Sequence, residues 1–284
     1  MEEDLLLKYK HLRPAIVALL PLIQRAQNGL ELEARFGCIT ANGFVAGVTE
    51  EFFESTLALL RQFNGHWHEN SGFFEVADFF YVVNGDTVRT RVAADGRGGS
   101  TTCHMKKKSV AKCDIPVLVA HANVDLSVRL PDIRVSLASE QEVGTINLPQ
   151  FIRPSRVTIG ERTSFLYGRI SHEPGLWQFD LSRRWSGATK VEAERARSNS
   201  PPVLEVELEC LSPTSYMNSL GPHYAAHESY RQHFLACSLL LKMADLFGSI
   251  SFQLLAAHAE DPENEPDRAE SIRESALKLL NSLK

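Results

Sequence analysis

Two strongly alternating stretches stand out in the pattern of apolar and polar positions along this chain. Residues 30–37 read Leu-Glu-Leu-Glu-Ala-Arg-Phe-Gly, with an apolar side chain at every second position and charged ones between them. The pattern returns at residues 204–209, which read Leu-Glu-Val-Glu-Leu-Glu. Side chains of a strand point alternately to its two faces. Each stretch therefore predicts a strand with one apolar face and one charged face.

The charged faces of these two strands carry rows of carboxylates, which repel one another and are costly to gather. They comprise Glu31 and Glu33 on the first strand and Glu205, Glu207 and Glu209 on the second. Exposure to water is the better explanation for one such strand. For two, each with a strongly apolar opposite face, a shared divalent cation is the better one, because Mg²⁺ and Mn²⁺ prefer oxygen ligands.

The region between residues 73 and 210 repeats this alternation, so the chain predicts at least seven strands with one apolar and one polar face. In residues 102–108 the alternation puts Lys106 and Lys108 on the polar face and leaves Lys107 on the other side. Basic residues recur on the polar faces at Arg89, Arg91, Lys106, Lys108, Arg134, Arg156 and Arg162. A later strand carries Gln178, Asp180 and Ser182 on its polar face.

The remaining segments predict helices and linkers. Helices are expected at residues 4–27, 49–63 and 224–247, the first of them broken or kinked by prolines, with a short amphipathic helix at 268–283. Residues 186–202 are polar, end in two prolines and predict a loop. We therefore expect one domain over residues 1–258, followed by a linker and a short helix at 259–284.

Composition narrows the function classes. The 284 residues include 5 cysteines, scattered and without a Cys-x-x-Cys pair, which suits reduced thiols in the cytosol or nucleus. The acidic start argues against a secretory signal, and no run of about 18 apolar residues predicts a membrane span. The net charge of −5 argues against a broad basic surface for nucleic acid, but it is compatible with a concentrated basic interior.

Closing such a sheet into a barrel removes its exposed edges and brings the first and last strands together. The glutamates of the two ends would then meet in a lumen lined by the basic residues. A polyphosphate suits that lumen, because the basic groups bind its oxygens while a metal polarises the terminal phosphorus and orients a water. A carboxylate that does not bind the metal directly would position that water as a base.

Four motifs in this order resemble the triphosphate tunnel metalloenzymes, and in particular the fungal and protozoan type of mRNA-capping RNA 5′-triphosphatase. They are Glu-x-Glu-x-Arg-Phe-Gly at residues 31–37, Arg-Thr-Ser-Phe at 162–165, Phe-Asp-Leu-Ser at 179–182 and Glu-x-Glu-x-Glu at 205–209. The resemblance covers about residues 30–210. It implies an α+β fold, in which an eight-stranded antiparallel β tunnel, a closed barrel with a charged lumen, rests on α-helices.

The resemblance also implies an activity and residue roles. The activity is metal-dependent removal of the γ-phosphate from the 5′ end of nascent RNA, the first step of mRNA capping, with a nucleoside triphosphatase side activity in Mn²⁺. Glu31, Glu33 and Glu209 would bind Mg²⁺ or Mn²⁺. Glu207 would orient the attacking water and Glu205 would support nearby bases. Arg162 would bind phosphate. Asp180 would be a supporting acid in the tunnel that does not itself bind the phosphate, and Arg35 would face the lumen.

The chain departs from the family pattern around the phosphate. Thr158 and Gly160 stand where the family often has basic residues, Gln178 replaces a frequent basic residue and Ser182 a threonine. Two alternatives therefore stay open. One is an inorganic tripolyphosphatase or a thiamine or nucleoside triphosphatase of the same fold, and the other is a non-catalytic polyphosphate- or lipid-binding barrel with solvated glutamates.

The expected partners follow from the presumed role in capping. They are the 5′-triphosphate end of nascent RNA and a separate RNA guanylyltransferase, with no membrane. The same role predicts a nuclear location, and otherwise a cytoplasmic one.

Overall fold

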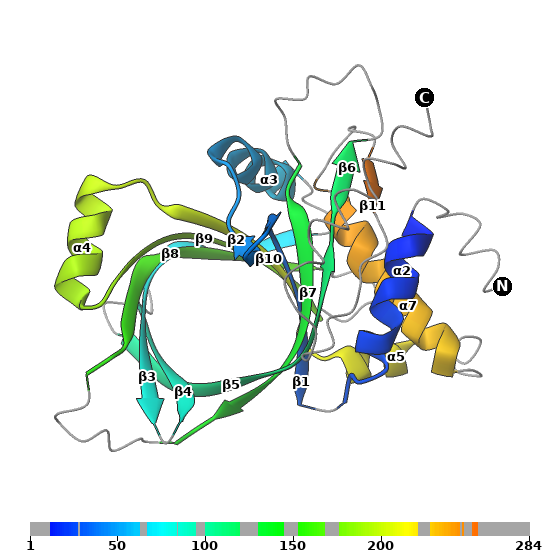
Figure 1. Ribbon diagram of the computed structural model, residues 1–284, viewed down its shortest axis with the longest axis horizontal. Helices are drawn as coiled ribbons and strands as arrows, with labels where there is room; N and C mark the ends of the chain where they lie inside the picture. Colours follow the sequence, from blue (N-terminus) through cyan, green and yellow to red (C-terminus); the bar gives the residue numbers. More distant parts are fainter. Residues whose placement is uncertain are drawn as a thin grey trace.

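A computed structural model of the protein describes residues 12–27, 29–62, 67–83, 85–94, 100–119, 130–144, 153–167, 176–220, 228–244, 246 and 252–254. Figure 1 shows these residues as a ring of strands, with α2, α5 and α7 together on one outer side and α4 on the opposite side. None of the described helices is long and apolar enough to cross a membrane. All 5 cysteines are free thiols.

One antiparallel sheet closes on itself. Its nine strands follow the order β10-β9-β8-β3-β4-β5-β7-β1-β2, and β10 also pairs with β1. β2 pairs with β1 alone and lies outside the ring. The other eight strands form a closed barrel, as the sequence predicted. The strands of this sheet are β1 (Leu30–Thr40), β2 (Gly43–Ala46), β3 (Trp67–Val83), β4 (Asp86–Ala94), β5 (Ser100–Ile115), β7 (Asp132–Glu142), β8 (Arg156–Tyr167), β9 (Trp177–Gly187) and β10 (Val203–Cys210).

A second, two-stranded sheet pairs β6 (Val117–Val119) with β11 (Phe252–Leu254). The described helices are α2 (Arg13–Ile23), α3 (Glu50–Gln62), α4 (Lys190–Asn199), α5 (Pro213–Ser219) and α7 (Glu228–Ala244). Three of them lie within the expected helical segments 4–27, 49–63 and 224–247, and Pro21 is inside α2. The helix expected at 268–283 lies outside the described residues.

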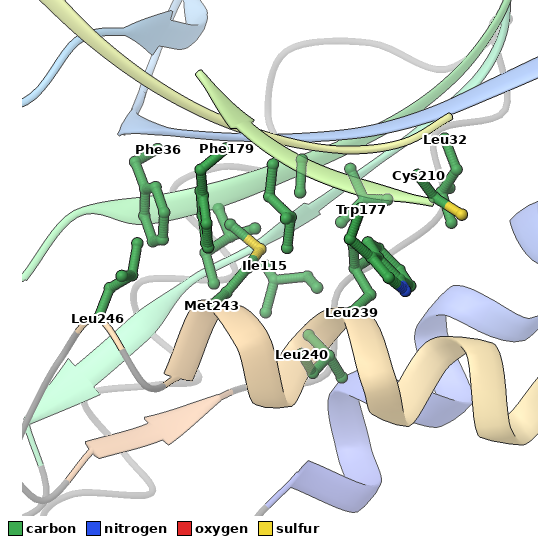
Figure 2. Close-up of a cluster of buried hydrophobic side chains, with 14 of the residues drawn as sticks. Leu32, Phe36, Ile115, Trp177, Phe179, Cys210, Leu239, Leu240, Met243 and Leu246 are labelled. Carbon is green, nitrogen blue, oxygen red and sulfur yellow. The ribbon is translucent and has the colours of Figure 1, made fainter. Parts of the chain in front are cut away.

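The hydrophobic core lies outside the barrel, between its wall and the helices. Figure 2 shows Leu32, Trp177 and Phe179 from the wall packed toward Leu239 and Met243 of α7, and all five are fully buried. The apolar faces of β1, β9 and β10 therefore point outward to the helices. The charged faces line the lumen, whereas in many barrels the interior is apolar.

The loop expected over residues 186–202 is wrong, because α4 lies within it. Thr189 caps this helix, and its side chain and that of Glu192 each accept a hydrogen bond from the other residue's backbone N–H. Sequence periodicity misses the helix because it has almost no apolar stripe: Ala193 is its one buried residue. Ala193 packs with Val157 and Ile159 of β8. Arg197 adds polar contacts to Glu75 of β3 and Glu161 of β8.

The lysines of β5 face the opposite way from the sequence prediction. In the antiparallel pairing, Arg89 is opposite Met105. Opposed residues share a face, so the odd-numbered residues of this part of β5 face the lumen. Lys107 therefore points inward. The expectation that Lys106 and Lys108 line the lumen is wrong, since Lys106 pairs with Asp86 outside and Lys108 is exposed.

The side-chain types at the start of the strand explain the error: the apolar Cys103 and Met105 predict an outward face, yet they lie on the lumen face together with Lys107. A β-bulge adds a second irregularity further along the strand. The register of β5 against β7 shifts between Ser109 and Ala111, and one extra residue reverses the alternation. Beyond the bulge the even-numbered Asp114 faces the lumen, opposite Arg134. Uninterrupted alternation assigns the whole strand to one parity, which this strand does not keep.

Candidate active site

The two glutamate-bearing strands meet side by side at the seam of the barrel. In the pairing of β1 with β10, Glu33 stands directly opposite Glu209 and Arg35 directly opposite Glu207. The same lumen face continues onto β7, where Arg134 is opposite Arg35. The carboxylates that the sequence singled out at the two ends of the sheet thus share one wall of the lumen.

The ammonium group of Lys107 lies among three carboxylates near this seam. Its Nζ is 3.1 Å from Glu33 Oε2, 3.5 Å from Glu31 Oε2 and 3.1 Å from Glu140 Oε1. Arg89 also reaches Glu140, with Nη2 3.4 Å from Oε1. Sequence reasoning missed Lys107 and Glu140. The first shares its face with the apolar Cys103 and Met105, which predicts an outward position, and the second lies near the end of an alternating strand that begins at Asp132.

Glu209 has no such counter-ion: among the described residues its carboxylate makes no hydrogen bond or ion pair. Burial, together with the nearby Glu31, Asp180 and Glu33, raises its pKa to about 8. Burial and Glu140 likewise raise the pKa of Glu31 to about 6, although Lys107 opposes this. This part of the lumen thus holds more negative charge than its own cations neutralise.

Glu207 is in the opposite situation. Arg35 Nε lies 2.8 Å from Glu207 Oε1 and also donates to Glu33 Oε1 at 2.7 Å. Burial opposes ionisation of Glu207, but the guanidinium groups of Arg35, Arg162 and Arg184 outweigh it and lower the pKa of Glu207 to about 2. Glu207 is therefore a firmly ionised carboxylate between the acidic seam and the arginines.

Asp180 organises a second cluster on β8 and β9. It is 1% exposed and accepts hydrogen bonds from Arg162, Ser164 and Gln178, the last at 2.9 and 3.0 Å. Burial alone would lower the pKa of Arg162, but Asp180 more than offsets this and raises it. Arg162 is thereby held as a fixed cation facing the lumen. Ser182, predicted with this group, is buried beside it in the same wall.

A third cluster centres on Asp78, which sequence reasoning also missed. Arg91 binds it with two hydrogen bonds, Nε to Oδ1 at 2.8 Å and Nη2 to Oδ2 at 2.9 Å. Arg184 reaches the same carboxylate at 3.0 Å and Glu205 at 2.7 Å. An acid flanked by Val76, Ala77, Phe79 and Phe80 in a strongly apolar stretch was the available signal for Asp78. Extending the alternation of Gln178, Asp180 and Ser182 by one step reaches Arg184.

Two further predicted phosphate ligands lie away from these clusters. Arg134 pairs with Asp114, with Nε 2.6 Å from Oδ1, and its guanidinium lies 4.7 Å from the centre of the Phe44 ring. Arg156 is exposed at the first position of β8, with its guanidinium 4.2 Å from the centre of the Phe80 ring. Both are on lumen-facing positions of their strands, but at the ends of those strands.

The overall arrangement matches solved structures. The sequence itself matches no known family profile and no curated protein. The RNA triphosphatase Pct1 of S. pombe superposes with a TM-score of 0.56 at 13% identity, covering 83% of this chain and 90% of that one. Its complex with the Spt5 CTD superposes with a TM-score of 0.57 at 14% identity and the same coverage. The triphosphatase of the Mimivirus capping enzyme superposes with a TM-score of 0.44 at 12% identity, covering 82% and 96% of the two chains.

The protein has the triphosphate tunnel fold. The closed eight-stranded barrel on flanking helices, expected from the motifs, is confirmed. In the tunnel, Glu31, Glu33, Glu205, Glu207 and Glu209 share the lumen with Arg35, Arg89, Arg91 and Arg162. The tunnel therefore has an acidic seam at β1 and β10 and a basic wall across β3, β4, β8 and β9.

The acidic seam of the tunnel fits a divalent cation by its chemistry. Within the described residues, no three acidic, histidine or cysteine side chains already stand in a ligand arrangement, and the Lys107 ammonium lies between Glu31, Glu33 and Glu140 instead. The raised pKa of buried Glu209 is the observation that favours a cation, because a positive charge there relieves the repulsion among Glu209, Glu31 and Glu33.

Proposed function

We propose that this protein is a metal-dependent RNA 5′-triphosphatase. It removes the γ-phosphate from triphosphate-ended RNA and leaves a 5′-diphosphate end and inorganic phosphate. The observation that carries the proposal is the pairing of Glu33 with Glu209 at the seam of a lumen whose far wall carries fixed arginines. A donor set for a hard cation and a binding surface for a polyanion thus face one another.

Glu31, Glu33 and Glu209 would hold the metal, Mg²⁺ or Mn²⁺, because burial and neighbouring acids raise the pKa of Glu31 and of Glu209, and Glu33 stands directly opposite Glu209. When bound, the metal polarises the terminal phosphoryl group and neutralises developing charge. For Glu31 and Glu33 this requires Lys107 to give up its present contacts at 3.5 and 3.1 Å. The ammonium is then available to the phosphate oxygens.

Arginines of the basic wall would bind the phosphate chain. Arg162 is oriented by Asp180, Arg91 by Asp78, and Arg89 by Glu140. Because these guanidinium groups are already held by carboxylates, they lose little freedom when a phosphate oxygen arrives. The remaining donors of each planar fork suit the paired oxygens of a phosphoryl group.

Glu207 would orient the attacking water. Its pKa of about 2 makes it ionised at neutral pH, so it accepts a hydrogen bond from that water but is a weak proton acceptor. Water oxygen attacks the γ-phosphorus, and the bridging bond to the β-phosphate breaks to give the RNA diphosphate. Glu205, paired with Arg184 at 2.7 Å, supports the basic wall.

The reaction would be the first step of mRNA capping, in the nucleus, with a separate guanylyltransferase acting on the diphosphate end. The similarity of the fold to Pct1 supports this role, and Pct1 also forms a complex with the Spt5 CTD. A Mn²⁺-dependent nucleoside triphosphatase activity belongs to the same proposal. The charged groups of the lumen would bind the triphosphate and would not contact the rest of the nucleotide.

That last point also favours a second candidate, an inorganic tripolyphosphatase or a thiamine or nucleoside triphosphatase. The net charge of −5 provides no broad basic track for RNA outside the lumen. Phosphate release from triphosphate-ended RNA, tripolyphosphate, thiamine triphosphate and ATP, each with Mg²⁺ or Mn²⁺, separates these functions. We expect the highest kcat/KM for RNA and no turnover in EDTA. A preference for tripolyphosphate would select the second candidate, and full activity in EDTA would exclude a metal enzyme.

A further inference from the structure

A small pocket opens in the basic wall of the lumen, between β3, β4, β8 and β9. Three arginines line it, Arg91, Arg162 and Arg184, together with two acidic residues. One is Asp78, and the other is Glu161, whose side chain pairs with Arg197 of α4 on the outside of the barrel. Positive charge therefore exceeds negative charge among the side chains that line the pocket. A phosphoryl group is an appropriate occupant, because fixed guanidinium forks match its oxygens.

Arg184 differs from the other two arginines in its anchoring. Its Nη1 donates to Glu205 and its Nη2 to Asp78, so it joins β9 to β10 on one side and to β3 across β8 on the other. Its side chain is 25% exposed, and these two contacts use only part of the five N–H donors of a guanidinium. Arg184 is thus fixed in direction and still has donors to offer the pocket.

The backbone of β8 explains why this cation comes from β9. Gly160 stands directly opposite Arg184 in the pairing of the two strands. The strands approach so closely there that a Cβ on residue 160 would collide with the carbonyl oxygen of Arg183. The preceding lumen-facing position on β8 is Thr158, which is uncharged and bound to Ser186 at 3.0 Å. β8 therefore supplies no cation beside the pocket before Arg162.

We propose that Arg184 is a phosphate-binding residue of this pocket, supplying from β9 the positive charge that β8 lacks beside Gly160. The inference rests on the proposed function for the identity of the ligand, a polyphosphate chain. Arg184 and Arg162 then hold one phosphoryl group from two neighbouring strands, with Arg91 on the third side. The pairing with Glu205 and Asp78 keeps the guanidinium in place before the ligand arrives.

The neighbouring arginine is a matched control. Arg183 faces the outside of the barrel, where its Nη2 lies 2.8 Å from Glu54 and its guanidinium 4.5 Å from the centre of the Phe73 ring. Its side chain is 27% exposed, close to the value for Arg184. Arg183→Gln and Arg184→Gln remove the same charge, one from each side of the same strand.

The experiment measures binding of tripolyphosphate to the metal-free protein in EDTA by titration calorimetry, with folding checked by circular dichroism. We expect Arg183→Gln to bind like the wild type and Arg184→Gln to bind about tenfold more weakly or worse. Equal affinities for the two variants, or no binding by the wild type, would overturn the assignment. If Arg184→Gln does not fold, Arg184→Lys is tested in its place, because it retains a positive charge for Asp78 and Glu205 but lacks the planar guanidinium group. Affinity of Arg184→Lys equal to that of the wild type would overturn the assignment.

A relocated charge provides the positive test. Thr158→Lys combined with Arg184→Gln restores a cation beside the pocket from β8, and we expect it to recover part of the lost affinity. Because binding in EDTA requires no turnover, the two proposals fail separately. A wild type that binds tripolyphosphate but hydrolyses no triphosphate contradicts the proposed function alone, whereas unaltered binding by Arg184→Gln contradicts the role of Arg184 alone.

Discussion

Glu33 and Glu209 stand directly opposite one another where the first strand of the barrel pairs with the last. Glu33 has Arg35 and Lys107 as counter-ions, while Glu209 has none among the described residues. The pair is therefore asymmetric: one carboxylate is neutralised by the protein, and the other carries a pKa of about 8 because its burial is not compensated. Under the proposed function, a divalent cation from solution would supply the charge that Glu209 lacks.

Removing either carboxylate is expected to abolish hydrolysis without unfolding the protein. Glu33→Gln and Glu209→Gln each lose a ligand for the proposed metal, and we expect kcat to fall roughly a thousandfold or more. Glu161→Gln, on the outer face of β8, is the control and should retain activity. Turnover within about tenfold of wild type in Glu209→Gln would exclude this residue as a metal ligand.

The register of β5 can be tested with neighbouring lysines. Lys107→Gln removes the cation beside Glu31, Glu33 and Glu140, so we expect a loss of kcat/KM of about tenfold to a hundredfold. Lys108→Gln changes an exposed side chain and should leave kcat/KM unaltered. The opposite result, with Lys108 sensitive and Lys107 tolerant, would favour the orientation that the sequence alone predicts for residues 102–108.

Asp78 predicts a pH dependence of stability. Burial opposes its ionisation, but Arg91 and Arg184 outweigh burial and lower the pKa of Asp78 below its ordinary value. A lowered folded pKa stabilises the protein at pH values above about 4, and this contribution is lost as the pH falls through the folded pKa. We therefore expect Asp78→Asn to have a smaller free energy of unfolding than wild type at pH 7, and the gap to narrow as the pH falls below about 4.

Urea denaturation between pH 7 and pH 2.5 measures this gap. Asp86→Asn is the comparison, because the Asp86–Lys106 pair is exposed and should contribute less than about 1 kcal/mol. A difference between Asp78→Asn and wild type that stays constant over the whole range would contradict ionisation of Asp78 as its source.

The core outside the barrel should carry much of the stability. Leu239 of α7 is fully buried and points toward the barrel wall (Figure 2), so Leu239→Ala should lower the free energy of unfolding by roughly 2–5 kcal/mol. Val17 of α2 is 55% exposed, and Val17→Ala should change it by less than about 0.5 kcal/mol. Similar losses in the two variants would show that α7 does not pack on the barrel as described.

Alternation in the sequence was sufficient to predict the strands and, for β1, β9 and β10, which side chains face the lumen. A strand of period two buries one face, and those three strands run without interruption. Glu33, Asp180 and Glu207 could therefore be assigned to the lumen without coordinates. The closed barrel followed from the motifs, and α4 was missed because its polar surface leaves no hydrophobic period to detect.

The tertiary structure alone decided which charges meet. The pairing of Glu33 with Glu209, the contacts of Arg184 with Asp78 and Glu205, and the inward position of Lys107 depend on strand order and register. These are long-range features, because hydrogen bonds between strands distant in the chain set them. The local alternation of one strand does not specify which strand pairs with it or in which register. The sequence by itself thus determined the chemical character of each strand face, and closure of the barrel determined the neighbours of each charge.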